Sequence, residues 1–210
     1  MNKNFKIIFA GCTVFAACLV SYLVYAHGCE PFAIDIAVRD FFVAMRNDVL
    51  NVLIPALTHC GDTVTIVALC AILVILPTRK KFGFPVTLAA LTGLAIYKPM
   101  KHIFLRARPD VMYHLVEQGG YSFPSGHSTS SVVVYGLLFY LIRKHCKNEA
   151  LKNVLSAICL IFALLIGPSR LYVGVHWFTD VVAGMLFGLT VVAIYICILE
   201  RIYNRDERLR

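Results

Sequence analysis

Residues 154–199 decide the fold, and they read VLSAICLIFALLIGPSRLYVGVHWFTDVVAGMLFGLTVVAIYICIL. Two apolar runs flank a short segment that contains Arg170, His176 and Asp180. A helix needs about 20 apolar residues to cross a membrane, and the second run is long enough to do so. Ionisable side chains are costly at membrane depth, so a functional role is the default interpretation of these three residues. The stretch therefore predicts two membrane helices joined by a functional segment.

The whole chain has the composition of a membrane protein. Of its 210 residues, 59% are hydrophobic and 15% are charged, whereas a soluble domain carries about 25% charged residues. The net charge is +8, but the basic residues fall between apolar blocks and form no aromatic-flanked stripe of the kind that binds nucleic acid. We therefore predict an all-α polytopic membrane protein with a single integral-membrane domain over residues 1–210. Its expected surroundings are the bilayer, with no nucleic acid partner.

Six transmembrane helices are predicted around a helical-bundle core. The second apolar block is interrupted at Gly61-Asp62, where Asp62 suits the N-cap of a helix that begins at Thr63. A separate short helix is expected before this break. Residues 32–45 mix apolar and charged side chains, which indicates an amphipathic helix in the membrane interface. The predicted spans are residues 7–26, 50–76, 84–105 with a kink at Pro99, 125–142, 154–167 and 177–199.

Positive charge sets the predicted orientation. Lys and Arg residues precede the first span, join spans two and three and spans four and five, and follow the sixth span from Arg201 onward. Cytoplasmic loops are enriched in Lys and Arg, so both termini are predicted to be cytoplasmic. The first block could be a signal peptide, but its apolar run exceeds the usual length of about 7–15 residues, which favours a retained span.

Positive charge also gathers at the predicted outer ends of the spans. Lys101 and Arg108 are separated by about two helical turns and share one helix face. Arg170 adds a third cation, and the planar guanidinium groups of the two arginines suit phosphate oxygens. These three side chains predict an anion site on the extracytoplasmic side.

A helix start between these segments strengthens the prediction of an anion site. Pro124 favours the first turn of a helix. The N–H groups of Ser125, Gly126 and His127 would then point out of the helix N-terminus, where the helix dipole favours an anion. Gly126 would let the backbone approach that anion closely. Together with the three cations, this arrangement predicts a phosphate group.

Two histidines and one carboxylate supply candidate catalytic groups. His176 and Asp180 are four residues apart and meet on one helix face. Asp180 can accept the Nδ1–H of His176, which frees Nε2 for attack on phosphorus and gives a phosphohistidine. His127 is the candidate general acid for the leaving oxygen and the base that then activates water. The sequence offers no carboxylate cluster for a divalent cation, so we expect no cofactor and a metal-independent reaction.

The three segments resemble the signature motifs of a known family. Lys-x6-Arg-Pro, Pro-Ser-Gly-His and Ser-Arg-x5-His-x3-Asp follow one another between residues 101 and 180. They are similar to the motifs of the type-2 phosphatidic acid phosphatase superfamily, which includes bacterial lipid phosphatases, soluble acid phosphatases and vanadium haloperoxidases. The resemblance implies His176 as nucleophile, His127 as acid and Asp180 as the orienting carboxylate. The phosphate contacts that it implies are Lys101, Arg108, Ser125, Gly126, His127 and Arg170.

The predicted function is hydrolysis of a phosphorylated or diphosphorylated lipid. Candidate substrates are undecaprenyl diphosphate, phosphatidic acid, phosphatidylglycerol phosphate and a lipid A phosphate. The short chain resembles small bacterial members linked to undecaprenyl diphosphate recycling, which favours the first of these by analogy. One alternative is a lipid phosphotransferase with the same phosphohistidine. Another is a non-enzymatic anion or lipid transporter, although the sequence shows no inverted repeat. A haloperoxidase is the remote alternative.

Two smaller expectations concern cysteine and the serine-rich start of the fourth span. The chain has eight cysteines and no C-x-x-C pair, which argues against a structural zinc site. Cys29 and Cys60 could both face outward, and a disulfide between them is an open alternative. The small polar residues 128–131 are expected to pack helices against one another, with a role in lining a pocket as the alternative.

Overall fold

The computed structural model describes residues 3–208 of the chain, and the side chains of residues 4–205. Over that range the elements are helical and no strand is present, which confirms the all-α prediction. The elements are α1 (Lys3–Ala26), α2 (Ala33–Ala44), α3 (Asp48–His59), α4 (Thr63–Ile75), α5 (Gly83–Phe104), the 3-10 turn η1 (Val111–Tyr113), α6 (Gly126–His145), α7 (Glu149–Tyr172) and α8 (Phe178–Arg208).

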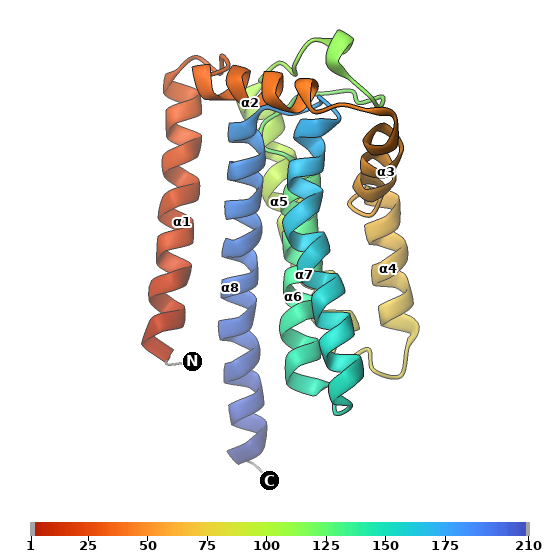
Figure 1. Cartoon of the computed structure of the whole chain (residues 1–210). Helices are drawn as coiled ribbons and strands as arrows, with labels where there is room; N and C mark the ends of the chain where they lie inside the picture. Colours follow the sequence, from red (N-terminus) through yellow and green to blue (C-terminus); the bar gives the residue numbers. More distant parts are fainter. Residues whose placement is uncertain (1–2, 209–210) are drawn as a thin grey trace.

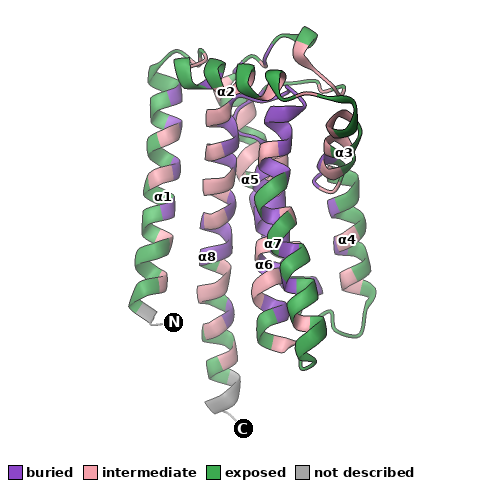
Figure 2. Cartoon of the chain, in the orientation of Figure 1, coloured by how far each residue is buried: buried purple, intermediate pink, exposed green. Residues whose placement is uncertain are grey.

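The long helices run side by side, and α2 lies across one end of the bundle (Figure 1). Helix α6 is central and packs against α5, α7 and α8, while α1 packs against α8. Figure 2 shows the burial concentrated on α6 and on the faces of its neighbours that turn toward it. Large apolar side chains such as Phe15, Val64 and Ile75 are exposed on the outer helices, as expected where lipid replaces water.

The prediction of six transmembrane helices is not confirmed. Among the described residues, three helices are long and apolar enough to cross a membrane, namely α1, α7 and α8. Helices α3 and α4 make a fourth span if this pair, bent by 47°, is counted as one. Helix α5 falls short because Gly, Thr, Pro and Lys98 dilute its apolar residues. Helix α6 falls short because it opens on His127 and a run of Ser and Thr and ends on basic residues.

The break between α3 and α4 and the N-cap position of Asp62 are confirmed, but the Asp62 side chain does not cap the helix. Asp62 is the N-cap residue of α4, yet its side chain makes no capping hydrogen bond. Its carboxylate contacts His59 and His127 instead. The Asp62 carboxylate therefore has two imidazole nitrogens as partners in place of the backbone N–H groups of α4.

One other helix end agrees with the prediction and one differs from it. Helix α6 begins as expected, with Ser125 as N-cap accepting a hydrogen bond from the N–H of Ser128. Helix α7 extends to Tyr172 rather than ending near residue 167, with Pro168 inside it, so that Arg170 lies in its last turn.

Cys29 and Cys60 are both free cysteines, so the structure contains no disulfide between them.

Candidate active site

All three sequence motifs meet around one polar cavity of about 150 Å³. Lys101 comes from the last turn of α5, whereas Arg108 comes from the loop that follows it, so the prediction that the two share one helix face was wrong. Gly126 and His127 come from the first turn of α6, and His176 comes from the segment between α7 and α8. Segments far apart in the chain thus place two cations, a helix N-terminus and two histidines around one space.

The ring nitrogens of His176 have different partners, and these partners fix its tautomer. Nε2 of His176 lies 3.2 Å from Nη1 of Arg108. A guanidinium can only donate, so Nε2 must accept and carry no proton. The proton is therefore on Nδ1, which donates to Oδ2 of Asp180 at 3.3 Å. The lone pair of Nε2 lies at the cavity, which is the arrangement that a nucleophilic histidine requires.

Asp180 is held by a buried network that the sequence did not reveal. Its Oδ1 accepts from Nη1 of Arg106 at 2.7 Å, and its Oδ2 also accepts from the N–H of Trp177 at 2.8 Å. The other terminal nitrogen of Arg106, Nη2, donates to Oδ2 of Asp35 on α2 at 2.8 Å. The side chains of Asp35, Arg106 and Asp180 have no exposed surface. Helix α2 is therefore tied to the carboxylate that orients His176.

Backbone carbonyls hold two of the predicted phosphate-binding cations in place. Arg108 donates to the carbonyl oxygens of Gly120, Val175 and Tyr121 at 2.9, 2.6 and 3.0 Å. Lys101 donates from Nζ to the carbonyl oxygen of Tyr121 at 2.7 Å. A carbonyl oxygen carries no full negative charge, so it does not neutralise the positive charge of either side chain. That charge is available to attract an anion into the cavity.

Arg170 has one N–H donor, at Nε, that is available to a ligand. Its Nη1 donates to Oγ1 of Thr58 at 2.9 Å, and its Nη2 donates to Oε1 of Gln118 at 2.6 Å. Its Nε is buried and has no hydrogen-bond partner among the described residues. An unpaired buried guanidinium donor is costly, so this atom is a candidate ligand for a phosphate oxygen.

The N-terminus of α6 differs from the predicted anion site at Ser125, whose N–H group is not free to bind an anion. The N–H of Ser125 donates to the carbonyl oxygen of Asp180 at 3.1 Å, so it already has a partner. The buried Ser125 hydroxyl accepts from Oγ of Ser128 at 2.8 Å. Ser125 therefore anchors α6 to α8, while Gly126 and His127 line the cavity.

Two glycines allow close approaches that any side chain would prevent. A Cβ at Gly126 would lie 2.9 Å from Cε2 of Tyr97, so this glycine lets the helix start pack against that ring. Gly174 has a φ of 77°, in the left-handed region, and a Cβ there would overlap the carbonyl oxygen of Tyr113. Gly174 thus shapes the turn that leads from Arg170 to His176.

Burial and the positive charge of the cavity favour the neutral form of His176. Burial and the nearby charge of Arg108 lower the pKa of His176 well below its ordinary value. Burial also lowers the pKa of Arg108, to about 10, which still leaves the guanidinium protonated at neutral pH. A neutral imidazole beside fixed cations is suited to attack an anionic electrophile such as a phosphate ester.

Several cavity residues were missed or misjudged from the sequence. Gln118 lies in a loop with no local signal, and only the structure brings it to Arg170. Tyr97 is one helical turn before Lys101, so the helical repeat alone could have placed it on the same face. Ser130 lines the cavity, although residues 128–131 were expected to serve helix packing. Thr63 completes this part of the lining from α4.

Comparison with known proteins agrees with this geometry. The model of the PAP2 superfamily matches residues 82–203. Phosphatidylglycerophosphatase B of Bacillus subtilis is 32% identical over 74% of this chain and 78% of its own length. An undecaprenyl-diphosphatase of Sulfolobus acidocaldarius is 28% identical over 66% of each protein.

A solved structure extends the comparison to the fold. The crystal structure of a transmembrane PAP2-type phosphatidylglycerolphosphate phosphatase from Bacillus subtilis superposes with a TM-score of 0.80 at 27% identity. The match covers 92% of this chain and 96% of that one. The family model, the relatives and this shared fold agree with the three motifs that converge on the cavity. The chain therefore belongs to the PAP2 superfamily, as an integral-membrane lipid phosphatase.

Proposed function

We propose that the protein hydrolyses a phosphate monoester or diphosphate of a lipid through a phosphohistidine on His176. The observation that carries this proposal is the pair of contacts made by His176, whose Nδ1 faces Asp180 while Nε2 lies 3.2 Å from Nη1 of Arg108 at the cavity. Lys101, Arg108 and Arg170 supply positive charge for the oxygens of the transferred phosphoryl group. These three cations supply the charge stabilisation that a divalent ion would otherwise provide.

The proposed reaction has two steps. In the first, Nε2 of His176 forms a bond to phosphorus while the bond from phosphorus to the leaving oxygen breaks, and His127 gives a proton to that oxygen. In the second, a water oxygen attacks phosphorus and gives a proton to His127. The bond between phosphorus and Nε2 breaks, and its electron pair returns to His176. Inorganic phosphate leaves with both histidines restored.

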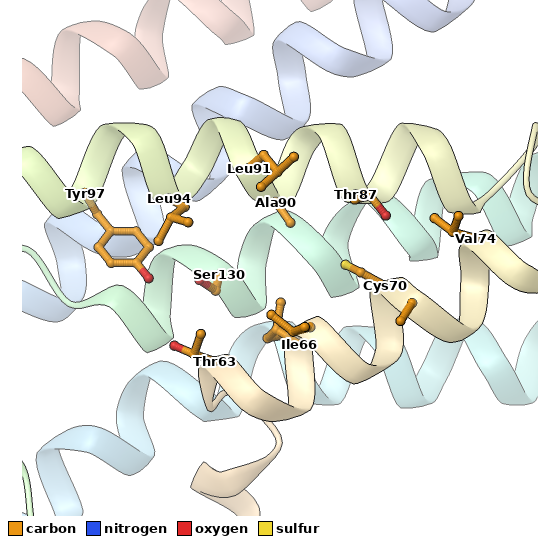
Figure 3. Close-up of a pocket in the computed structure, with 12 residues that line it drawn as sticks. Thr63, Ile66, Cys70, Val74, Thr87, Ala90, Leu91, Leu94, Tyr97 and Ser130 are labelled. Carbon is orange, nitrogen blue, oxygen red and sulfur yellow. The ribbon is translucent and has the colours of Figure 1, made fainter.

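An apolar groove beside the cavity supports a lipid substrate. The groove has a volume of about 350 Å³ and lies between α4 and α5 (Figure 3). Thr63, Tyr97 and Ser130 line both the groove and the polar cavity, so the two spaces adjoin. Figure 3 shows Ile66 and Leu94 directed into the groove from its two helices. We propose that a lipid tail occupies the groove while its phosphate lies in the cavity.

Filling the groove is expected to discriminate between long-chain and water-soluble substrates. Ala90→Trp places a large ring among the groove residues, so kcat/KM for a long-chain lipid phosphate should fall by about tenfold or more. Hydrolysis of p-nitrophenyl phosphate, which has no tail, should change little. Leu164→Trp on the exposed face of α7 is the matched control. Equal losses on both substrates with Ala90→Trp would contradict a tail in the groove.

The identity of the lipid is open to direct assay. The relatives named above bear the names phosphatidylglycerophosphatase B and undecaprenyl-diphosphatase. We propose phosphatidylglycerol phosphate and undecaprenyl diphosphate as the two leading substrates. Phosphate release from each, and from phosphatidic acid, should be compared in detergent with excess chelator. Activity that needs an added divalent cation would contradict the metal-independent reaction.

The low pKa of His176 predicts activity that persists in mildly acidic solution. Because burial and the charges of Arg108 and Lys101 lower this pKa well below 6.5, the free enzyme keeps a neutral nucleophile there. The acid limb of kcat/KM, which reports groups of the free enzyme, is therefore expected below pH 6.5. Lys101→Met removes one of these charges and should move the limb toward higher pH. A wild-type limb above pH 6.5 would show that His176 does not titrate as expected.

The molecule that accepts phosphate from the phosphohistidine decides between a hydrolase and a phosphotransferase. A phosphohistidine can pass its phosphate to a lipid alcohol as well as to water, so transfer to an added lipid alcohol remains the alternative outcome. The lipid-phosphatase relatives and the shared transmembrane fold favour either reaction over a transporter or a haloperoxidase. We further propose that α5 and α6 also cross the membrane, which gives six spans with α3 and α4 as one. Helix α1 begins and α8 ends away from α2 (Figure 1), which supports cytoplasmic termini and an extracytoplasmic site.

A further inference from the structure

Asp62 lies between two histidines at the break between α3 and α4. Its Oδ1 is 2.6 Å from Nε2 of His127, and its Oδ2 is 2.7 Å from Nδ1 of His59. The ring of His127 lines the cavity, with 16% of its side chain exposed, whereas 65% of the His59 side chain is exposed. The carboxylate therefore joins the general-acid candidate inside the cavity to an imidazole at the surface.

The contact determines which nitrogen of His127 is available to a substrate. A Cβ built on Gly61 would lie 3.2 Å from Cδ2 of His127, so the edge formed by Cδ2 and Nε2 faces the turn at residues 61–62. Nε2 is engaged by Asp62, and the structure gives Nδ1 no partner among the described residues. A carboxylate beside Nε2 favours the tautomer with the proton on Nε2, which leaves the lone pair on Nδ1.

The two histidines of the site are thus held through opposite nitrogens. Asp180 accepts from Nδ1 of His176 and leaves Nε2 for attack. Asp62 is placed to accept from Nε2 of His127 and leaves Nδ1. We propose that Asp62 is a positioning residue that directs Nδ1 of His127 to the leaving-group oxygen and, with its carboxylate charge, favours the protonated ring. This inference rests on the proposed phosphatase mechanism.

The proposal assigns each proton to an atom. In the first step, the proton on Nδ1 of His127 moves to the leaving oxygen as the bond from Nε2 of His176 to phosphorus forms. In the second, the attacking water gives a proton to the lone pair on Nδ1. Asp62 keeps its negative charge throughout and holds the proton on Nε2 of His127. Its charge should therefore affect steps in which the leaving group needs a proton.

The kinetic test compares leaving groups. Asp62→Asn removes the charge but keeps an oxygen acceptor, so kcat for a lipid phosphate should fall about 10- to 100-fold with little change in KM. Hydrolysis of p-nitrophenyl phosphate, whose leaving group needs no proton, should fall far less. Asp48→Asn, the same change at an exposed position of α3, is the matched control. In a His127→Ala background, Asp62→Asn should cause no further loss.

Two kinetic outcomes would overturn the inference. One is an Asp62→Asn variant with wild-type kcat on the lipid phosphate. The other is an equal loss on both substrates that persists in the His127→Ala background, because this pattern indicates a structural contact between the α3–α4 break and α6. The wild-type enzyme is tested first, with His176→Ala as its reference. Absence of phosphate release that depends on His176 would count against the proposed function.

A spectroscopic test addresses the tautomer independently of activity. Nitrogen chemical shifts of isotope-labelled histidine distinguish protonated from unprotonated ring nitrogens, and the signals of His127 are assigned by their loss in His127→Ala. At a pH at which the ring of His127 is neutral, wild type should show its proton on Nε2, and Asp62→Ala should give a mixture of tautomers. The same tautomer ratio in both proteins would exclude positioning by Asp62. Asp62→Asn is the substitute if Asp62→Ala does not fold.

Discussion

His176→Ala should reduce phosphate release from a lipid substrate by about 10⁴-fold or more, because it removes the atom that bonds to phosphorus. Nε2 of His176 is unprotonated, faces the cavity and lies beside Arg108. Among the described residues that line the cavity, the other imidazole is that of His127, and its Nε2 is occupied by Asp62. His127→Ala should lower the rate less, by about 10²- to 10⁴-fold, as expected for loss of general acid–base catalysis.

The covalent intermediate gives the decisive measurement for this prediction. Rapid mixing of wild type with radiolabelled lipid phosphate, followed by alkaline quenching, should trap label on the protein, because a phosphohistidine is stable to base and labile to acid. His176→Ala should trap none. His102→Ala, which removes an exposed histidine of α5, should behave as wild type. Label that persists in His176→Ala, or that is stable to acid, would show that another residue is the nucleophile.

Local signals in the sequence predicted much of the fold and part of the site. The break at Gly61-Asp62 and the N-cap of α6 at Ser125 depend on residues next to one another, and both lie where expected. The pairing of His176 with Asp180 was expected from the helical repeat and is present in the structure, although His176 lies just before α8 and not on it. These features require only nearest-neighbour geometry, which a single sequence records.

Contacts between distant segments could not be predicted in this way. Asp35 belongs to a segment interpreted as an interfacial helix, but it pairs with Arg106, 71 residues away. Asp62 is at the expected N-cap position, but its carboxylate contacts His127, 65 residues away, instead of the N–H groups of α4. In both cases the alternative partner of the carboxylate lies on another helix, and no periodicity marks it. The resemblance to a family named the residues of the motifs but not the residues that hold them.

Asp35→Ala should destabilise the fold by about 3–5 kcal/mol, since it leaves a buried guanidinium with half of its negative partners. Asp35 accepts from Arg106, from the N–H of Thr179 at 2.8 Å and from the N–H of Phe32 at 3.0 Å. The side chains of Asp35 and Arg106 are fully buried, so water cannot replace the lost carboxylate. Unfolding in detergent with increasing denaturant measures the loss.

A control on the same helix tests whether burial is the cause. Asp40 pairs with Arg39 on α2, but 58% of its side chain is exposed. Asp40→Ala should therefore change the free energy of unfolding by no more than about 0.5 kcal/mol. If Asp35→Ala unfolds at the same denaturant concentration as wild type, the buried network does not stabilise the bundle.

The same substitution should also slow catalysis, although Asp35 does not line the cavity. Arg106 uses one terminal nitrogen for Asp35 and the other for Asp180, so loss of Asp35 frees the guanidinium to shift. Asp180 would then hold Nδ1 of His176 less firmly, and kcat should fall with little change in KM when assayed where the variant is folded. Asp35→Asn keeps one oxygen acceptor, which can accept from the N–H of Thr179 or from the N–H of Phe32 but not from both, and should recover part of the stability. It cannot restore the charge opposite Arg106, so kcat should recover less than stability if the ion pair positions Asp180. Equal recovery of both would mean that α2 supports the site through its backbone contacts alone.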